Sequence, residues 1–394
     1  VKFDPTFSRS FDYLFAVFSE SEITELVHTF SFKMTTKLVK APCESIELLF
    51  GTESDSKPCD PSASDSSVGD MTSSDYYFNS YAHFGIHEQM LKDEVRTVSY
   101  MRAICDNAHL FSGKVVLDVG CGTGVLSMFA ARAGAKVVYA VEMSRIVDQA
   151  REIVQKNGFD GVVEIIEGKM EEVELPSKVD IIISEWMGYF LFYESMLESV
   201  VFARDKWLKP GGLIFPDKCT LFLCAIEDAQ YRAGKIDFWD DVYGLKMDCI
   251  KKIALSEPLV DIVYGEQVCT AVQPVIEVDV NTVKSEDLTF AVPFRLQQTR
   301  TDFAHAIVAF FDVRFTHCHR PIVFDTGPFS KPTHWNHTVF YLDKTLALEA
   351  GELIQGTLAC RPNKRNPRDL DIAISYYVDA KNIKTNSVLR YWLR

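Results

Sequence analysis

The sequence lacks the features that mark several common classes of protein. No stretch approaches the roughly eighteen consecutive apolar residues of a membrane span, and the apolar segment 11–18 lacks a basic flank and a cleavage site, so we expect neither membrane segment nor signal peptide. The ten cysteines form no Cys-x-x-Cys pair or zinc-ligand spacing, which indicates reduced, intracellular thiols. The formal net charge of −14 argues against nucleic-acid binding and suits a basic polypeptide ligand.

One tripeptide has the side chains of a metal cluster. His317, Cys318 and His319 are residue types that bind zinc, but Phe311–Phe315 before them alternates as a β-strand does. We therefore predict that the tripeptide continues the strand and that the chain binds no metal.

Composition divides the chain into parts. Gly51–Ser74 is dominated by Ser, Asp, Thr, Pro and Gly and cannot bury much apolar surface, which predicts a disordered linker. Before it, Ser19 and Glu22 form a capping-box pair in front of apolar residues at helical spacing, which predicts one helix without catalytic chemistry. The predicted parts are an extension and linker over 1–73, a first domain over 74–216 and a second domain over 217–394.

The two predicted domains differ in their patterns. In the first, short apolar runs alternate with amphipathic segments, which predicts an α/β domain with a doubly wound parallel sheet. Its strands are expected at 115–118, 136–141, 162–166, 179–184 and, after a turn, within 209–216, and its helices at 125–133 and 146–156. In the second domain, short alternating segments predict a β-barrel or sandwich. A helical, aromatic insertion between Tyr231 and Val263 interrupts it. Its strands are expected at 220–226, 275–280, 304–315, 338–342, 353–358 and 370–378.

A glycine-rich loop follows the first predicted strand. Gly120, Gly122 and Gly124 stand directly before a helix, where glycines let a ligand approach the backbone and the helix N-terminus. Glu142 ends the next strand, in position to accept both hydroxyls of a ribose. The spacing is G-x-G-x-G, so no third glycine stands in the register of the dinucleotide fingerprint G-x-G-x-x-G, which favours S-adenosylmethionine over NAD. Glu171, after the following strand, is either an adenine contact or one more solvated charge in an acidic run.

Two glutamates bound an otherwise apolar, aromatic or glycine segment. Glu185 and Glu194 enclose it directly after the strand 179–184. Burial of an isolated carboxylate is unfavourable, so the pair implies a cationic partner. A guanidinium fits best, because it is planar, stays protonated and offers parallel N–H donors. The alternative is that each glutamate only caps a helix or pairs with a nearby arginine.

Five segments of the chain carry motifs that occur together in one family: 76–81, 87–97, 116–124, 184–196 and 333–335. From about Ser74 to its end, the sequence resembles the protein arginine N-methyltransferases, type I in particular, in which these motifs have the same order. The resemblance implies an α/β Rossmann-like S-adenosylmethionine-binding domain, followed by a β-barrel domain with a helical dimerisation arm at about 229–263. It also implies methyl transfer to guanidino nitrogens of protein arginine, giving mono- and asymmetric dimethylarginine.

The resemblance implies roles for the matching residues. Those implied at the reacting nitrogen are Glu185 and Glu194, the flanking Met90 and Met196, and the pair His334 and Asp93. Those implied to bind the cofactor are Tyr81, His87, Met90, Arg96, Gly120, Cys121, Glu142, Met143, Glu171 and Met196. Arg96 would pair with the cofactor carboxylate and orient Glu185, while Tyr77 and Tyr81 would belong to a helix that closes over the cofactor.

The resemblance further implies partners and a location. The arm would dock on a second copy's cofactor domain, giving a homodimer or higher oligomer, and three aromatics (Phe238, Trp239 and Tyr243) are candidates for that contact unless they close the arm onto its own barrel. Arginine-containing proteins, such as Gly-Arg-rich proteins and histones, would be substrates in nucleus and cytoplasm, with no direct nucleic acid and no membrane as partner. An NAD-linked oxidoreductase would leave the glutamate pair unexplained. A non-catalytic scaffold is disfavoured by the intact Arg96, Glu142 and glutamate pair.

Overall fold

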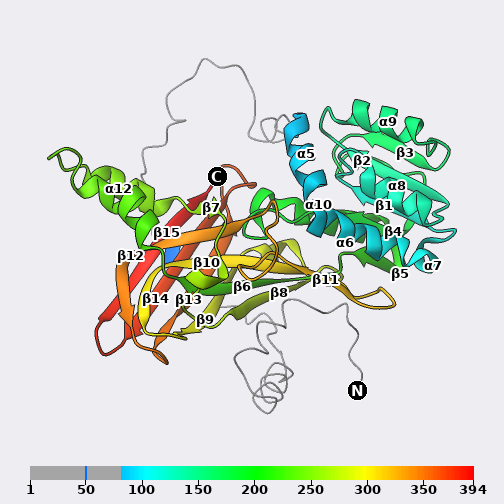
Figure 1. The fold of residues 1–394 in the computed structure, drawn as a ribbon. Coiled ribbons are helices and arrows are strands. Elements are labelled where there is room, and N and C mark those ends of the chain that lie inside the picture. The colour runs from blue at the N-terminus through cyan, green and yellow to red at the C-terminus, as the bar shows by residue number, and fades with distance from the viewer. Residues whose placement is uncertain (1–48, 51–80) are drawn as a thin grey trace, which may run out of the picture.

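The computed structural model describes residues 49–50 and 81–394. The helix predicted after Ser19, the linker 51–74 and Tyr77 lie outside the described residues. Figure 1 shows an α/β lobe beside a lobe of antiparallel strands, from which a helical arm projects. The predicted fold class, a Rossmann-like domain followed by a barrel, is confirmed.

The α/β lobe is built on five parallel strands in the order β3-β2-β1-β4-β5. They are β1 Val115–Val119, β2 Val137–Glu142, β3 Val163–Glu167, β4 Val179–Ser184 and β5 Leu208–Phe215. β1, β2 and β4 are almost wholly buried, as expected for parallel strands covered by helices. The strand order reverses between β1 and β4, so the crevice at their carboxyl ends is where a ligand is expected. Gly120 and Glu185 directly follow these two strands.

Among the described residues, six helices accompany this sheet: α5 Phe84–Lys92, α6 Glu94–Cys105, α7 Ala108–Phe111, α8 Val125–Arg132, α9 Val147–Lys156 and α10 Met196–Trp207. Asp93 separates α5 from α6, and its carboxylate accepts the backbone N–H of Arg96 at 3.0 Å. This N-cap fixes where α6 begins, and therefore the position of Arg96 in the first turn of the helix.

Two antiparallel sheets form the second lobe. One has the order β7-β12-β10-β6-β8, with β11 paired to β10, and the other the order β15-β14-β13-β9. Their strands are β6 Lys218–Ile226, β7 Leu259–Asp261, β8 Gln273–Asp279, β9 Phe290–Gln297, β10 Asp302–Phe315, β11 Ile322–Asp325, β12 His337–Leu348, β13 Leu353–Pro362, β14 Leu370–Asp379 and β15 Lys384–Leu393. Short 3-10 turns lie at Tyr193–Ser195, Gly265–Gln267 and Ser285–Leu288. The six strands predicted for this lobe are all present.

Four strands of this lobe were not predicted: β7, β9, β11 and β15. β9 contains Pro293, which argues against a strand, but β9 lies at the edge of its sheet, where a missing N–H leaves no ladder partner unpaired. The first half of β15 is polar, so it shows little alternation.

The prediction that His317–His319 continues the strand was wrong. β10 ends at Phe315, and the tripeptide lies in the turn that follows. The backbone leaves the ladder because its N–H groups find side-chain acceptors: that of Thr316 donates to Asp217 at 2.6 Å, and that of His319 to Asn107 at 2.9 Å.

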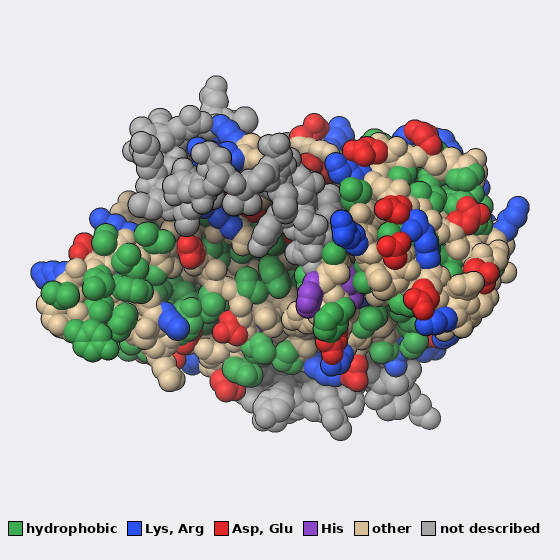
Figure 2. Space-filling view, turned by 90° about the horizontal axis from the view of Figure 1, so that it is seen from above, with side chains coloured by type: hydrophobic (Ala, Val, Ile, Leu, Met, Phe, Trp, Pro, Cys, Tyr) green, Lys and Arg blue, Asp and Glu red, His purple; other side chains and the backbone are tan. Residues whose placement is uncertain are grey.

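The insertion between β6 and β7 is helical, as predicted. It contains α11 Ala229–Tyr231, a π-helical turn at Arg232–Ile236, a 3-10 turn at Asp237–Asp240 and α12 Asp248–Ser256. Hydrophobic side chains gather at the end of the molecule that this arm forms (Figure 2). In the part of the chain that the structure describes, no helix is long and apolar enough to cross a membrane.

Candidate active site

A cavity of about 260 Å³ opens at the carboxyl ends of β1 and β4. All but one of the predicted site residues line it: Tyr81, His87, Met90, Arg96, Gly120, Cys121, Glu142, Met143, Glu171, Glu185, Glu194, Met196 and His334. The exception, Asp93, lies directly behind His334. The residues come from α5, α6, the α/β sheet and the barrel lobe, so the cavity exists only because both lobes meet there.

The glycine loop forms one wall. Gly120 and Gly122 have φ values of +71° and +55°, a backbone conformation that glycine adopts without strain. A Cβ at Gly120 would collide with Met196, and one at Gly122 would press against the ring of His87. The loop therefore brings bare backbone to the cavity, in front of α8.

One carboxylate ends β2 and another follows β3. Glu142 accepts the backbone N–H of Gly122 at 2.8 Å and that of Ser144 at 2.7 Å, which holds it at the end of β2. Each of its oxygens can accept a further hydrogen bond. Glu171 is exposed, accepts the hydroxyl of Ser199 at 2.6 Å and lines the cavity.

Arg96 and Glu185 form a buried ion pair. Arg96 Nε lies 3.1 Å from Glu185 Oε2, and the two side chains are only 7% and 9% exposed. Arg96 Nη1 donates to the carbonyl of Met90 at 3.2 Å. The other oxygen of Glu185, Oε1, is buried and finds no hydrogen-bond partner among the described residues. A carboxylate oxygen left in this state is ready for a cationic donor.

The double-glutamate loop, residues 185–194, has a tightly folded backbone. Phe190, Leu191 and Glu194 have φ values of +56°, +67° and +73°, which non-glycine residues rarely adopt. Gly188 pairs with Leu191 in a β-bridge, and a Cβ at Gly188 would collide with the carbonyl of Tyr193. The strained positions lie in the second half of the loop, which ends at Glu194.

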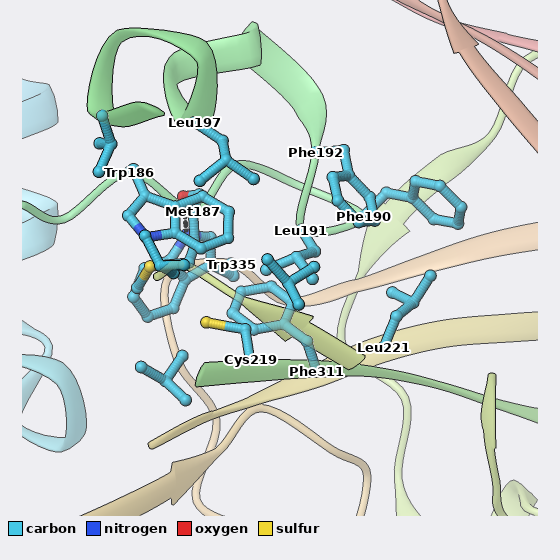
Figure 3. Packing of buried hydrophobic residues seen from close by; sticks show 14 of the residues in the cluster. Trp186, Met187, Phe190, Leu191, Phe192, Leu197, Cys219, Leu221, Phe311 and Trp335 are labelled. Atoms are coloured by element: carbon cyan, nitrogen blue, oxygen red, sulfur yellow. Dashed lines mark hydrogen bonds between the residues drawn. The ribbon is translucent and has the colours of Figure 1, made fainter. Parts of the chain in front are cut away.

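Packing between the lobes holds the loop in this shape. Figure 3 shows its apolar side chains packed among residues of both lobes. Trp335 Nε1 donates to the carbonyl of Met187 at 2.7 Å, and Phe190 packs against Phe340 with ring centroids 5.6 Å apart. Glu185 and Glu194 thus stand at the ends of a segment anchored by its own apolar residues.

Glu194 is held from two directions. Its Oε2 accepts a hydrogen bond from the hydroxyl of Tyr81 at 2.8 Å. Its backbone N–H donates to the carbonyl of Arg368 at 2.9 Å, and its own carbonyl accepts from Arg368 Nη1 at 2.8 Å. The N-cap residue of α10 is Ser195, so Glu194 does not occupy the capping position of that helix. Arg368 also lines the cavity but was not predicted, because its polar turn between β13 and β14 looks like any surface loop in the sequence.

His334 and Asp93 form a pair at the barrel side of the cavity. The ring Nδ1 of His334 lies 2.8 Å from Asp93 Oδ2, which also accepts the backbone N–H of His334 at 2.9 Å. Burial raises the pKa of Asp93, but hydrogen bonds from His334 and from the backbone of Arg96 outweigh it, so the pKa lies below its ordinary value. Asp93 therefore stays ionised and ties the barrel to the start of α6.

A further acid lies behind the glycine loop. Asp118 is fully buried in β1, and its Oδ2 accepts the hydroxyl of Ser127 at 2.7 Å. Burial raises the pKa of Asp118 to about 7.

Across the described ranges, no group of three or more His, Cys, Asp or Glu side chains is placed to hold a metal ion.

Comparisons with known proteins identify relatives of this chain. Residues 217–381 match the family model for the arginine methyltransferase oligomerization subdomain, and residues 116–212 match that for a methyltransferase domain. Protein arginine N-methyltransferase 1 of Chlamydomonas reinhardtii is 59% identical over 327 residues, which cover 83% of this chain and 95% of that protein. The corresponding protein of Schizosaccharomyces pombe is 57% identical over 307 residues, covering 78% and 90%. A solved structure, the Trypanosoma brucei PRMT1 enzyme-prozyme heterotetrameric complex with AdoHcy, matches with a TM-score of 0.79 and 48% identity, over 80% of this chain and all of that one.

Proposed function

Because the chain belongs to the protein arginine N-methyltransferase family, we propose that the cavity at the double-glutamate loop is where it methylates protein arginine with S-adenosylmethionine. This assignment rests on one observation. Glu185 Oε1 is buried in the cavity wall and has no hydrogen-bond partner among the described residues. A guanidinium N–H would donate to this oxygen and also offset its negative charge, whereas a neutral donor would supply the hydrogen bond without the charge.

The residues present fit the cofactor. The glycine loop lets a nucleoside approach the backbone, Glu142 has capacity for the ribose hydroxyls, and Glu171 for the adenine amino group. The hydrogen bonds of Arg96 within the described chain use Nε and Nη1, so we assign its Nη2 to the cofactor carboxylate. When bound, S-adenosylmethionine supplies a methyl group carried on a positively charged sulfonium.

The two glutamates make the substrate nitrogen reactive. A guanidinium is a poor nucleophile because its lone pairs are delocalised. Carboxylates on one side draw positive charge toward the nitrogens they contact, which leaves lone-pair character on the remaining nitrogen. Each charge-assisted hydrogen bond contributes about 1.5–3 kcal/mol, so positioning and electrostatics together lower the barrier. The pair His334–Asp93 is the candidate acceptor for the proton that leaves the methylated nitrogen, with an orienting role as the alternative.

The type I product is asymmetric dimethylarginine. We assign the room for a second methyl group on the same nitrogen to Met90, which lines the cavity and is slimmer at its tip than a phenylalanine. Met196, which lies beside Gly120 and also lines the cavity, would confine the acceptor nitrogen together with Met90.

Oligomerisation is a property of the matched subdomain, and we propose a homodimer anchored by the arm. Tyr243 is 98% exposed and Phe238 is 44% exposed, so these rings do not close the arm onto its own barrel. Trp239 is half-buried and packs against Phe238, with centroids 5.2 Å apart. Large exposed aromatics on a projecting arm are typical of an interface.

The acidic charge of −14 favours basic substrates. We propose that Gly-Arg-rich proteins and histone tails are the substrates, that they are methylated in nucleus and cytoplasm, and that neither nucleic acid nor membrane is a direct partner.

The test is transfer of a radiolabelled methyl group from S-adenosylmethionine to a Gly-Arg-rich peptide, with the same peptide carrying Lys for Arg as control. Labelling of the arginine peptide alone is expected. Equal labelling of both peptides, or of neither, would contradict the proposal.

A further inference from the structure

A row of small residues crosses the four-stranded sheet of the barrel lobe. Ala291 on β9 pairs with Ala359 on β13, which pairs with Ala373 on β14. The residues on either side in each strand, such as Cys360 and Ile372, belong to the main core, so the alanines face away from it. Alanine is depleted in strands, and three in register leave a shallow apolar depression on the outer face.

A residue far away in sequence fills this depression. Phe50 is only 7% exposed and forms a separate apolar cluster with the three alanines and Leu49. The guanidinium of Arg361 lies over the ring of Phe50, 4.1 Å from its centroid. Arg361 Nε is 3.3 Å from Asp371, so the cation that covers the ring is held by an ion pair.

The backbone next to Phe50 is recognised as well. Arg390, which follows Ala373 in the row on β15, donates from Nε to the carbonyl of Leu49 at 2.9 Å. An aromatic side chain in a depression and a hydrogen bond to the preceding carbonyl together define a position and a direction for the peptide. None of these residues lines the active-site cavity.

We propose that the outer face of β9, β13, β14 and β15 is a peptide-docking site, separate from the catalytic cavity, whose occupant is Leu49–Phe50 of the same chain. The docking ties the N-terminal extension to the barrel lobe. Three contacts of different kinds support it: apolar burial of the ring, the cation over its face, and the hydrogen bond to the carbonyl.

The test is the rate at which chymotrypsin cuts the full chain after Phe50, followed by mass spectrometry of the fragment that ends there. Docking shields this bond, so cleavage requires release of the ring. Ala359→Leu fills the depression and leaves the cleaved sequence unchanged. It should raise the cleavage rate about ten- to hundredfold, which is the factor expected when the burial of one phenylalanine is lost. Gln355→Leu places the same side chain on the same face of β13, away from Phe50, and should leave the rate unchanged.

If the Ala359→Leu variant does not fold, Arg390→Met on the edge strand β15 serves as a second variant. It removes the donor to Leu49 and should raise the rate several-fold, by about the factor of one hydrogen bond. Cleavage equally fast in the native chain and in both variants would overturn the proposal. Protection that disappears on dilution would also overturn it, because the occupant would then be a second copy rather than the same chain.

Discussion

Replacement of Glu194 by Gln is the sharpest perturbation of the proposed mechanism. It keeps the size of the side chain and an oxygen that can accept the hydroxyl of Tyr81, which lies 2.8 Å from the native carboxylate, and it leaves the backbone bonds to Arg368 untouched. It removes one negative charge from the cavity wall. A substrate guanidinium would then face the carboxylate of Glu185 alone, and Glu185 already shares one oxygen with Arg96.

The expected loss follows from the strength of a charge-assisted hydrogen bond. Such a bond contributes about 1.5–3 kcal/mol, and each ~1.4 kcal/mol is a factor of ten in rate. One lost bond lowers kcat/KM about ten- to hundredfold, and weaker localisation of charge on the guanidinium adds to the effect. We therefore expect methyl transfer to fall about 100-fold or more, while affinity for S-adenosylmethionine changes less than about twofold.

The assay measures cofactor affinity by calorimetry and turnover on a Gly-Arg-rich peptide, with Glu164→Gln as control. Glu164 is exposed on β3, away from the cavity, so its variant should match the native chain in both measurements. If Glu194 only held the chain in place before the helix that follows, the Gln variant would keep its turnover. Near-normal turnover in Glu194→Gln would therefore refute the double-glutamate mechanism.

Four further predictions concern the product, the oligomer, the extension and pH. Mass spectrometry of the product should show asymmetric dimethylarginine, because Met90 leaves room for the second methyl; symmetric dimethyl or only monomethyl product would contradict this. The double variant Phe238→Asp, Tyr243→Asp should elute as a monomer with weakened cofactor affinity, and a fully active monomer would exclude the arm as the dimer contact. A chain that begins at Met71 should keep its peptide turnover, but it should melt at a lower temperature because the row of alanines is uncovered. Burial raises the pKa of Asp118 to about 7 in the folded chain, whereas its ordinary pKa of 3.8 applies in the unfolded chain. Between these two values the unfolded chain binds fewer protons, so stability falls as pH rises. Thermal unfolding between pH 5 and 8 should therefore depend less on pH in Asp118→Asn, and equal slopes would contradict the assignment.

The central strands and the glycine loop could be predicted because their signals are local. Short and mostly apolar runs mark β1 and β4, and three glycines before a helix mark the loop. The glutamate pair was recognisable because two carboxylates in apolar company need an explanation. The function itself rested on the resemblance, since a carboxylate pair alone leaves the alternatives of a cap or an ion pair open.

Other features could not be read from the sequence because they depend on distant partners. Arg368 reaches Glu194 from a turn 174 positions away, and nothing in that turn distinguishes it from a solvated loop. Phe50 finds its depression only once three strands have paired in register. The tripeptide after Phe315 was misjudged because the acceptors that draw the backbone out of the ladder, Asp217 and Asn107, lie 99 and 212 positions from the residues that donate to them.

The position of the substrate arginine tests the central claim most directly. A crystal structure of the chain with S-adenosylhomocysteine and a Gly-Arg-rich peptide should place the guanidinium in the cavity, with one N–H on Glu185 Oε1 and another on the carboxylate of Glu194. The remaining nitrogen should face the sulfur of the cofactor product. A guanidinium bound elsewhere, with Glu185 Oε1 still without a donor, would contradict the account.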